Sequence, residues 1–163
     1  MTEVSESVGR YLRAIHLLTA ETDRRAETGE LAAVLDVSDA SVTNMVTTLA
    51  DRELADYEKY EGVVLTGEGE SAAREFAWRR CVAENFLKDD LDVDVATLRE
   101  TDKDDAPDPR ALGQVLSEEA AHRLKDLVDH PCDGKCRAPH DEYSECSDEV
   151  QTTAERVESE SQS

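Results

Sequence analysis

The sequence predicts a mostly α-helical protein with one small β-hairpin, built as an N-terminal winged helix-turn-helix followed by a helical dimerisation domain. Apolar residues repeat at helical spacing over much of residues 7–128. Two short strand-like runs, at 54–60 and 63–66, interrupt them. A chain of 163 residues allows one or two small domains. The expected units are 1–68 for the winged helix, 69–131 for the dimerisation domain, and 132–163 for a Cys/His segment with an acidic, disordered tail.

The N-terminal unit is expected to contain three helices, at 7–20, 28–35 and 38–52. Thr28 is a candidate cap for the second helix, and Ser38 for the third. Asp36-Val37 forms the tight turn between these two helices, and Glu61-Gly62 is the expected hairpin turn. A helix-turn-helix followed at this distance by a hairpin is typical of a winged helix.

The third helix has one apolar face and one small, polar, uncharged face. No charged residue occurs between Ala40 and Ala50. In so acidic a protein, a merely solvated face would be expected to carry Asp and Glu. Short hydroxyl and amide side chains are suited to base edges and phosphates in a major groove. The pattern therefore indicates double-stranded DNA as the partner, against the alternative of a generic helical domain. The polar residues are Ser41, Thr43, Asn44, Thr47 and Thr48.

The charge balance is strongly acidic, with 39 Asp and Glu against 18 Lys and Arg and a net charge of -21. Because the phosphate attraction dominates most DNA binding, this balance would ordinarily argue against such a partner. The acids are spread along the whole chain and lysine is scarce, which is typical of halophilic proteins. In molar salt the Debye length falls to about 3 Å, so repulsion from DNA is screened. We therefore expect weak binding at low salt.

No apolar run of membrane length and no signal-peptide pattern is found, so we expect a cytoplasmic protein without a membrane partner. No nucleophile–base or phosphate-loop pattern is found either, which argues against an enzyme. His16 and His122 lie beside apolar helical positions and are expected at the edge of the core.

The C-terminal half is expected to begin with a long helix at about 68–91. Its apolar stripe exceeds what the hairpin can cover, so self-association into a homodimer is expected. An acidic break follows at 92–108, with a short helical piece at 95–100. Pro109 opens the next helix, at 111–128, and Ser117 is a candidate for a second helix start inside it.

Residues 5–131 resemble the diphtheria-toxin-repressor family of iron- and manganese-dependent transcriptional repressors. The matching pieces are RYLRAIHLL, ELAAVLDVSDASVTNMVTTL, the wing YEKYEGVVLTGEGE, CVAENFL and VLSEEAAHRLKDLVDHP. The resemblance implies a dimer that presents two recognition helices to a palindromic operator. It implies phosphate contacts from Ser38, Ser41 and Thr43, a base contact from Asn44 and a thymine contact from Ala40. The wing residues Lys59 and Tyr60 would lie near the flanking backbone, and Thr47 completes the predicted DNA-binding set.

The chain departs from this family at the metal ligands. The resemblance places the primary metal site at Arg10, Arg110, Gly113 and Gln114, none of which is a family ligand type. At the ancillary site it places Arg80 and Glu84, so that only Glu84 survives. Activation by iron or manganese at these positions is therefore not expected. Arg10 and Arg110 could instead imitate the charge of a metal, which would give a constitutive DNA-binding protein.

A second cluster of metal-ligand types lies near the C-terminus, in HPCDGKCRAPHDEYSEC. Thiolates and imidazoles at close spacing suit Zn²⁺, and Fe²⁺ less well. A divalent transition metal (Fe, Mn or Zn) is therefore expected, with a thiol-redox response as an alternative, since two thiols there could form a reversible disulfide. A protein-interaction module on the same scaffold is a further alternative. The candidate ligands are Cys132, Cys136, His140, Cys146, Glu84 and Cys81, with His130 as a further possibility.

Overall fold

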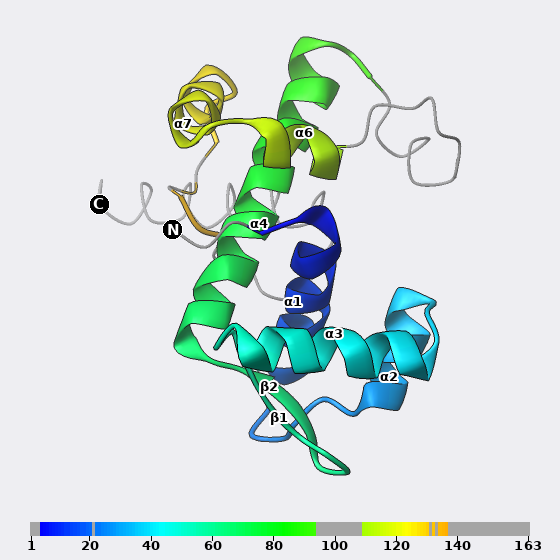
Figure 1. Cartoon of the computed structure of the whole chain (residues 1–163). Coiled ribbons are helices and arrows are strands. Elements are labelled where there is room, and N and C mark those ends of the chain that lie inside the picture. Colours follow the sequence, from blue (N-terminus) through cyan, green and yellow to red (C-terminus); the bar gives the residue numbers. More distant parts are fainter. Residues whose placement is uncertain (1–3, 21, 94–108, 131, 133, 137–163) are drawn as a thin grey trace, which may run out of the picture.

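The computed structural model describes residues 4–20, 22–93, 109–130, 132 and 134–136. Helices dominate, with one two-stranded antiparallel sheet (Figure 1). The elements in chain order are α1 Glu6–Thr19, α2 Thr28–Leu35, α3 Asp39–Asp51, β1 Ala55–Glu58, β2 Gly62–Leu65, α4 Gly67–Asn85, the π-helical turn η1 Phe86–Asp90, α6 Pro109–Val115 and α7 Glu118–Leu127. The predicted fold class is confirmed.

The helix starts follow from local capping chemistry. Ser5, Ser38, Thr66 and Ser117 each accept a hydrogen bond from the backbone N–H three residues on, at 3.1–3.3 Å. The expected cap of α2 is wrong by one residue, because Glu27 is the N-cap and Thr28 is the first helical residue.

The wing differs from its prediction in the position of the turn. Glu58 pairs with Gly62, so the loop is 59–61 and the expected Glu61-Gly62 turn is wrong. Gly62 has φ 111°, and a Cβ there would lie 2.5 Å from the Ala26 carbonyl oxygen. Glycine is required at that point because Ala26 bridges to Val63 through two backbone hydrogen bonds of 2.9 Å. The loop before α2 therefore pairs with β2 through this one bridge and lies along the edge of the wing.

The C-terminal helices are shorter and more broken than expected. The single helix predicted at 111–128 is interrupted, and Ser117 caps a separate helix α7, as the second start signal indicated. α4 ends at Asn85 and continues as η1 rather than as α-helix to residue 91. The short helix expected at 95–100 and the tail beyond 136 lie outside the described residues.

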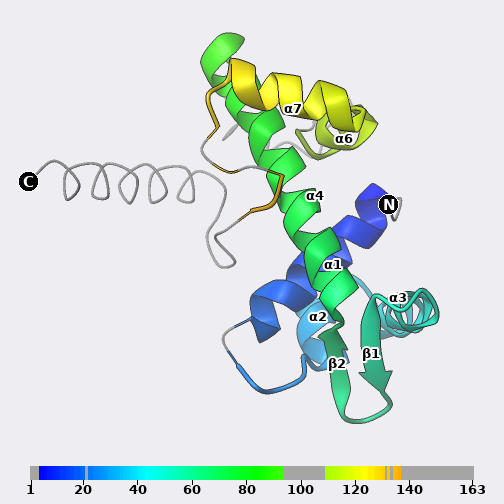
Figure 2. The same ribbon diagram turned by 90° about the vertical axis from the view of Figure 1, so that its left-hand side faces the viewer.

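Two apolar clusters share α4. The first joins α1, α2, α3, the wing and the start of α4, and contains Leu12, Ile15, Leu31, Leu49 and Val63. The second lies around Trp78 and contains Ala77, Cys81, Val82, Ala121, Cys132 and Cys136. Both views show α4 running from the wing toward α6 and α7, with α1 beside it (Figures 1 and 2). Most of the predicted apolar stripe is thus covered within the chain, whereas Leu91 at its end is 53% exposed, and self-association stays a prediction.

Candidate functional site

The recognition helix α3 presents its polar face outward. Val42, Val46 and Leu49 are fully buried, and they anchor the opposite face to the first cluster. The view in Figure 1 shows α3 along the outside of the molecule, close to the wing. The predicted DNA-binding residues of this helix and its cap are all exposed: Ser38, Ala40, Ser41, Thr43, Asn44 and Thr47. Their exposure is confirmed, and their contacts to DNA stay a prediction.

The start of α3 is fixed by the turn and cap that the sequence predicted. Asp36 adopts a left-handed conformation with φ 54°, which ends α2 and redirects the chain. The Ser38 hydroxyl oxygen accepts from the Ser41 N–H at 3.2 Å, and the hydroxyl donates to the Ser41 Oγ at 2.9 Å. This cap holds a hydroxyl at the positive end of the helix, where a phosphate is also favoured.

The tip of the wing carries one cation and two carboxylates. Tyr60 is 94% exposed, and the Lys59 Nζ lies 5.2 Å from the centre of its ring. A side-chain hydrogen bond with Glu61 raises the pKa of Glu58, because two carboxylates lie close together there. The predicted contacts of Lys59 and Tyr60 with a flanking backbone are compatible with their exposure. The neighbouring acids make this tip a poor phosphate site at low salt.

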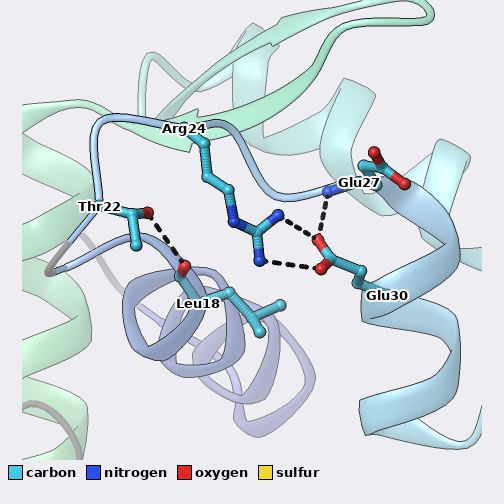
Figure 3. A network of polar contacts seen from close by, with 5 residues as sticks. All are labelled: Leu18, Thr22, Arg24, Glu27 and Glu30. Atoms are coloured by element: carbon cyan, nitrogen blue, oxygen red, sulfur yellow. Dashed lines mark hydrogen bonds and ion pairs between the residues drawn. The ribbon is translucent and has the colours of Figure 1, made fainter.

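Two arginines before α2 join this loop to α2 and to the wing. Figure 3 shows Arg24 donating two hydrogen bonds to the Glu30 carboxylate, at 2.9 and 3.0 Å, while Glu30 also accepts from the Glu27 N–H at 3.0 Å. The Arg24 hydrogen bond is the main reason that the pKa of Glu30 is lowered. Arg25 forms an ion pair with Asp56 of β1 at 2.9 Å. Neither arginine was predicted to have a role, although two adjacent arginines in so acidic a chain are a visible signal in the sequence.

Gly113 stands where the resemblance places a metal-binding carboxylate. At this residue α6 approaches α4 closely. A Cβ on Gly113 would lie 2.8 Å from the Arg79 carbonyl oxygen, so only glycine lets α6 approach α4 here. The Arg79 guanidinium donates to the Gly113 and Leu116 carbonyl oxygens, at 3.1 and 2.7 Å, and so holds the end of α6 on α4. At Gly113 the described contacts are thus those of helix packing.

Glu84, the surviving family ligand, is buried beside a guanidinium. Its Oε2 lies 3.9 Å from the Arg80 Nε one turn earlier, and both side chains are largely buried. Arg10 is exposed on α1. Among the described residues, no three His, Cys, Asp or Glu side chains are grouped so that they could hold a metal ion. The predicted participation of Glu84 in a metal site with the cysteines gains no support from this geometry.

The cysteine segment lies along α4. We call residues 130, 132 and 134–136 the strap, and Figure 2 shows it beside α4. The Trp78 indole N–H donates to the Cys132 carbonyl oxygen at 3.0 Å, and the Arg74 Nη1 donates to the Cys136 carbonyl oxygen at 2.9 Å. The Cys136 N–H donates back to the Arg74 carbonyl oxygen at 3.1 Å. Arg74, Trp78 and Cys81 follow helical i, i+4, i+7 spacing, so one face of α4 holds the strap.

His130 joins the strap to α4 through a sulfur contact. Its Nε2 lies 3.0 Å from the Cys81 Sγ, and its Nδ1 accepts from the Cys132 N–H at 3.2 Å. Because a backbone N–H can only donate, Nδ1 is unprotonated and Nε2 carries the proton of the neutral ring. Burial lowers the pKa of His130, which favours this neutral form. In this arrangement His130 is a hydrogen-bond donor to Cys81.

Three of the predicted ligands belong to one apolar cluster, but the described residues do not group them as metal ligands. Cys81, Cys132 and Cys136 are each at most 4% exposed and share the cluster around Trp78. His140 and Cys146 lie outside the described residues. His16 is buried, and the His122 ring contacts Trp78 in a tilted arrangement with ring centres 5.0 Å apart, so both belong to the packing of the molecule.

Comparisons with known proteins agree with the fold and with the recognition helix. The family model for the iron-dependent repressor N-terminal DNA-binding domain matches residues 3–63. An uncharacterized HTH-type transcriptional regulator of Methanocaldococcus jannaschii is 32% identical over 122 residues, which cover 75% of this chain and 92% of that protein.

Two solved structures share the fold at lower identity. ScaR with bound Zn²⁺ has a TM-score of 0.62 and 22% identity, over 78% of this chain and 61% of that one. The manganese regulator SloR has a TM-score of 0.63 and 24% identity, over 80% of this chain and 56% of that one. The chain thus spans a little over half the length of these two proteins. Members of this family are transcriptional regulators, so the expectation that the chain is not an enzyme is also confirmed. With the winged helix in place and α3 exposed beside the wing, the chain belongs to the iron-dependent, or diphtheria-toxin-repressor, family of DNA-binding transcriptional regulators.

Proposed function

We propose that this chain is a cytoplasmic homodimeric repressor that binds a palindromic double-stranded DNA operator through α3, with an affinity set by a transition metal bound to thiols. The observation that carries the DNA-binding part is the outward face of α3. It exposes Ala40, Asn44 and Thr47 at i, i+4, i+7 spacing and carries no charge between residues 40 and 50. A helix with this face can enter a major groove without bringing a carboxylate against the base edges.

The proposed DNA binding takes place at high salt. Asp39, Asp51, Glu58 and Glu61 are exposed around the recognition face, and the chain carries a net charge of -21. At low ionic strength these carboxylates repel phosphates, and screening in molar salt removes most of this repulsion. Affinity for the operator is therefore expected to rise or stay level as salt increases, opposite to the usual loss through counterion release.

A second copy of the chain supplies the second recognition helix. One winged helix reads one half-site, and a palindrome needs two that are related by a two-fold axis. Apolar side chains remain exposed in the C-terminal half even though α4 is covered. Leu91 is 53% exposed, Leu127 65% and Val115 79%. These residues are the candidate contacts between copies.

The metal response is assigned to sulfur ligands. ScaR was solved with bound Zn²⁺ and SloR is described as a manganese regulator, but of the family ligand positions that the resemblance assigns, only Glu84 keeps a ligand residue in this chain. Cys81, Cys132 and Cys136 come from two distant segments and share one buried apolar cluster, and thiolates favour Zn²⁺ over Mn²⁺. The described residues do not group three ligand side chains, so metal binding would have to draw these thiols closer together. His140 and Cys146 are the further predicted ligands. His130 would act behind Cys81, because its Nε2–H stabilises the thiolate form that binds metal.

The DNA-binding proposal is tested by substitution on α3. A duplex enriched from a randomised pool by the full-length protein in molar KCl serves as the probe. Asn44→Ala with Ser41→Ala is expected to weaken binding at least about tenfold, since one base contact is worth about 1–3 kcal/mol. Ser7→Ala, on the exposed side of α1, is the control and is expected to bind as the unchanged protein does. Equal affinity of all three proteins would contradict the assignment of α3, whereas a failure to enrich any duplex would favour a protein-interaction module.

The metal proposal is tested by elemental analysis of protein purified without chelator, followed by operator gel shifts. Cys132→Ser and Cys136→Ser are expected to lose both the metal and its effect on DNA affinity, whereas Glu84→Gln is expected to keep them. An affinity that chelator and thiol reductant both leave unchanged would favour a constitutive DNA-binding protein. A response to reductant alone, without metal, would favour the thiol-redox alternative.

A further inference from the structure

The two adjacent arginines of the loop before α2 bind different elements. Arg24 donates to the Glu30 carboxylate of α2 (Figure 3). The Arg25 Nη2 donates to the Asp56 carboxylate of β1 at 2.9 Å. The Arg25 Nη1 donates to the Asp56 carbonyl oxygen at 2.9 Å and to the Gly62 carbonyl oxygen of β2 at 3.5 Å. One guanidinium therefore contacts both strands of the wing, while its neighbour holds the helix-turn-helix.

The wing is a small sheet that depends on its surroundings for a fixed position. Its two strands have four residues each, and an isolated two-stranded hairpin is at best marginally stable in water. Val63 is fully buried and pairs with Ala26, which fixes the base of the wing. Arg25 packs at Gly62, where a Cβ would lie 3.0 Å from the Arg25 Cβ. The arginine therefore holds the wing directly beside the exposed loop 59–61.

Charge alone would make Asp56 unfavourable for DNA binding. Each exposed carboxylate on the wing adds to the repulsion of phosphates by a chain of net charge -21. Asp56 and Glu58 lie two residues apart on β1, so their side chains share one face of the strand. Glu58 interacts with the Glu61 carboxylate, whereas Asp56 forms an ion pair with Arg25. The two acids thus have the same strand and the same charge but different partners.

We propose that the Arg25–Asp56 pair is a positioning pair for operator binding, which fixes the wing against the helix-turn-helix so that Lys59 and Tyr60 reach the DNA backbone while α3 lies in the groove. Asp56 then favours DNA binding in spite of its charge. This inference rests on the proposed operator binding. The Debye length is about 3 Å in 1 M salt, so repulsion over longer distances is screened more strongly than this pair, whose atoms are 2.9 Å apart.

The test compares Asp56→Thr with its matched control Glu58→Thr, on the enriched duplex in molar KCl. Each variant loses one carboxylate from β1, and threonine is favoured in strands, so the wing is expected to stay folded in both. Asp56→Thr is expected to weaken binding about fivefold, because a loosened wing must be ordered when DNA binds. Glu58→Thr is expected to bind as tightly as the unchanged protein, or more tightly. Urea unfolding in the same salt gives the fraction of each variant that is folded.

Arg25→Met separates positioning from a direct contact between Arg25 and a phosphate. Positioning predicts that Arg25→Met weakens binding at least as much as Asp56→Thr. The double variant is expected to bind no more weakly than Arg25→Met alone, because both substitutions break the same pair. A direct phosphate contact predicts instead that Asp56→Thr strengthens binding, since it frees the guanidinium. That result would overturn the proposal.

Hydroxyl-radical footprinting gives a readout that a loss of stability does not imitate. Asp56→Thr is expected to reduce protection of the backbone that flanks each half-site and to leave protection at its centre unchanged. The proposal is also overturned if Asp56→Thr matches Glu58→Thr in affinity, or if its loss disappears once affinity is expressed per folded protein. If Asn44→Ala with Ser41→Ala leaves binding unchanged as well, the proposed operator contact through α3 fails too. A loss in that double variant limits the failure to the positioning of the wing.

Discussion

The two halves of the chain place their chemically active side chains in opposite directions. In the N-terminal half, the hydroxyl, amide and methyl groups of α3 face outward, and only Val42, Val46 and Leu49 of that helix are buried. In the C-terminal half, the sulfur and imidazole groups of Cys81, His130, Cys132 and Cys136 face inward against Trp78. Both halves begin helices with the same serine cap, at Ser38 and Ser117.

The difference indicates which side chains of a regulator can change while its fold is kept. α3 addresses a partner of fixed shape outside the molecule, so its surface must fit the groove whatever happens to the core. An internal metal site has no external template, and packing can replace it. Gly113, where the resemblance implies a metal ligand, has no side chain and lets α6 lie directly on the backbone of α4 at Arg79.

The largest loss of unfolding free energy is expected from a substitution of Arg79. Its guanidinium holds two carbonyl oxygens at the end of α6, and Arg79→Met leaves both acceptors partly buried without it. Loss of such bonds costs about 2–4 kcal/mol of unfolding free energy in total, measured by urea denaturation in high salt. The control is Arg123→Met, which breaks an ion pair with Glu119 that is mostly exposed and worth at most about 0.5 kcal/mol. Equal small losses in both variants would show that α6 is not held on α4 as described.

The next largest effect is expected from a methyl group placed between the helices. Gly113→Ala puts a Cβ against the Arg79 backbone, and such overpacking costs about 1–3 kcal/mol. Gly29→Ala is the matched control, because its Cβ meets nothing within 4 Å and alanine is favoured in a helix by about 0.5–1 kcal/mol. Thermal unfolding should therefore move in opposite directions for the two variants. A stabilising Gly113→Ala would mean that the close approach of α6 to α4 is absent.

The serine caps of α3 and α7 allow the N-terminal and C-terminal halves to be compared directly. Ser38→Ala and Ser117→Ala each remove one cap bond, of 3.2 and 3.1 Å, and each is expected to cost about 1 kcal/mol of unfolding free energy. Only Ser38→Ala is expected to weaken operator binding beyond this loss, since its hydroxyl lies at the DNA-facing end of α3. Gel-shift titrations against the concentration of folded protein measure the operator affinity of each variant. Equal operator affinity in the two variants would limit Ser38 to capping.

The smallest effect on stability is expected from a change in pH, and it concerns only His130 of the strap. Burial lowers the pKa of His130 in the folded chain, so the unfolded chain takes up a proton first as the pH falls. Stability is unaffected by His130 above the unfolded pKa of about 6.5, and it declines below that value toward the folded pKa. His130→Gln should flatten the decline in melting temperature between about pH 7.5 and about pH 5.5. An unchanged slope in this variant would mean that His130 is not held as a buried neutral ring.

Much of the N-terminal half was predictable because its determinants are local. The apolar face of α3, the cap at Ser38 and the turn at Asp36-Val37 all act within a few residues, and each appears at its predicted place. Met45, predicted on the same face, is partly buried. The hairpin was predicted, but its turn was displaced, because the position of Gly62 depends on Ala26, which is distant in sequence. A contact between segments far apart in the chain leaves no period or spacing in the sequence.

The sequence by itself determined the helical class, the helix starts and an uncharged recognition face, because spacing and capping chemistry are properties of neighbouring residues. The tertiary structure alone decided what covers α4, that Glu84 lies beside Arg80, and that Cys81 meets His130 across 49 residues of chain. It also decided that the threonine hydroxyls of α3 donate to their own helix, because this depends on side-chain orientation, which the order of residues does not fix.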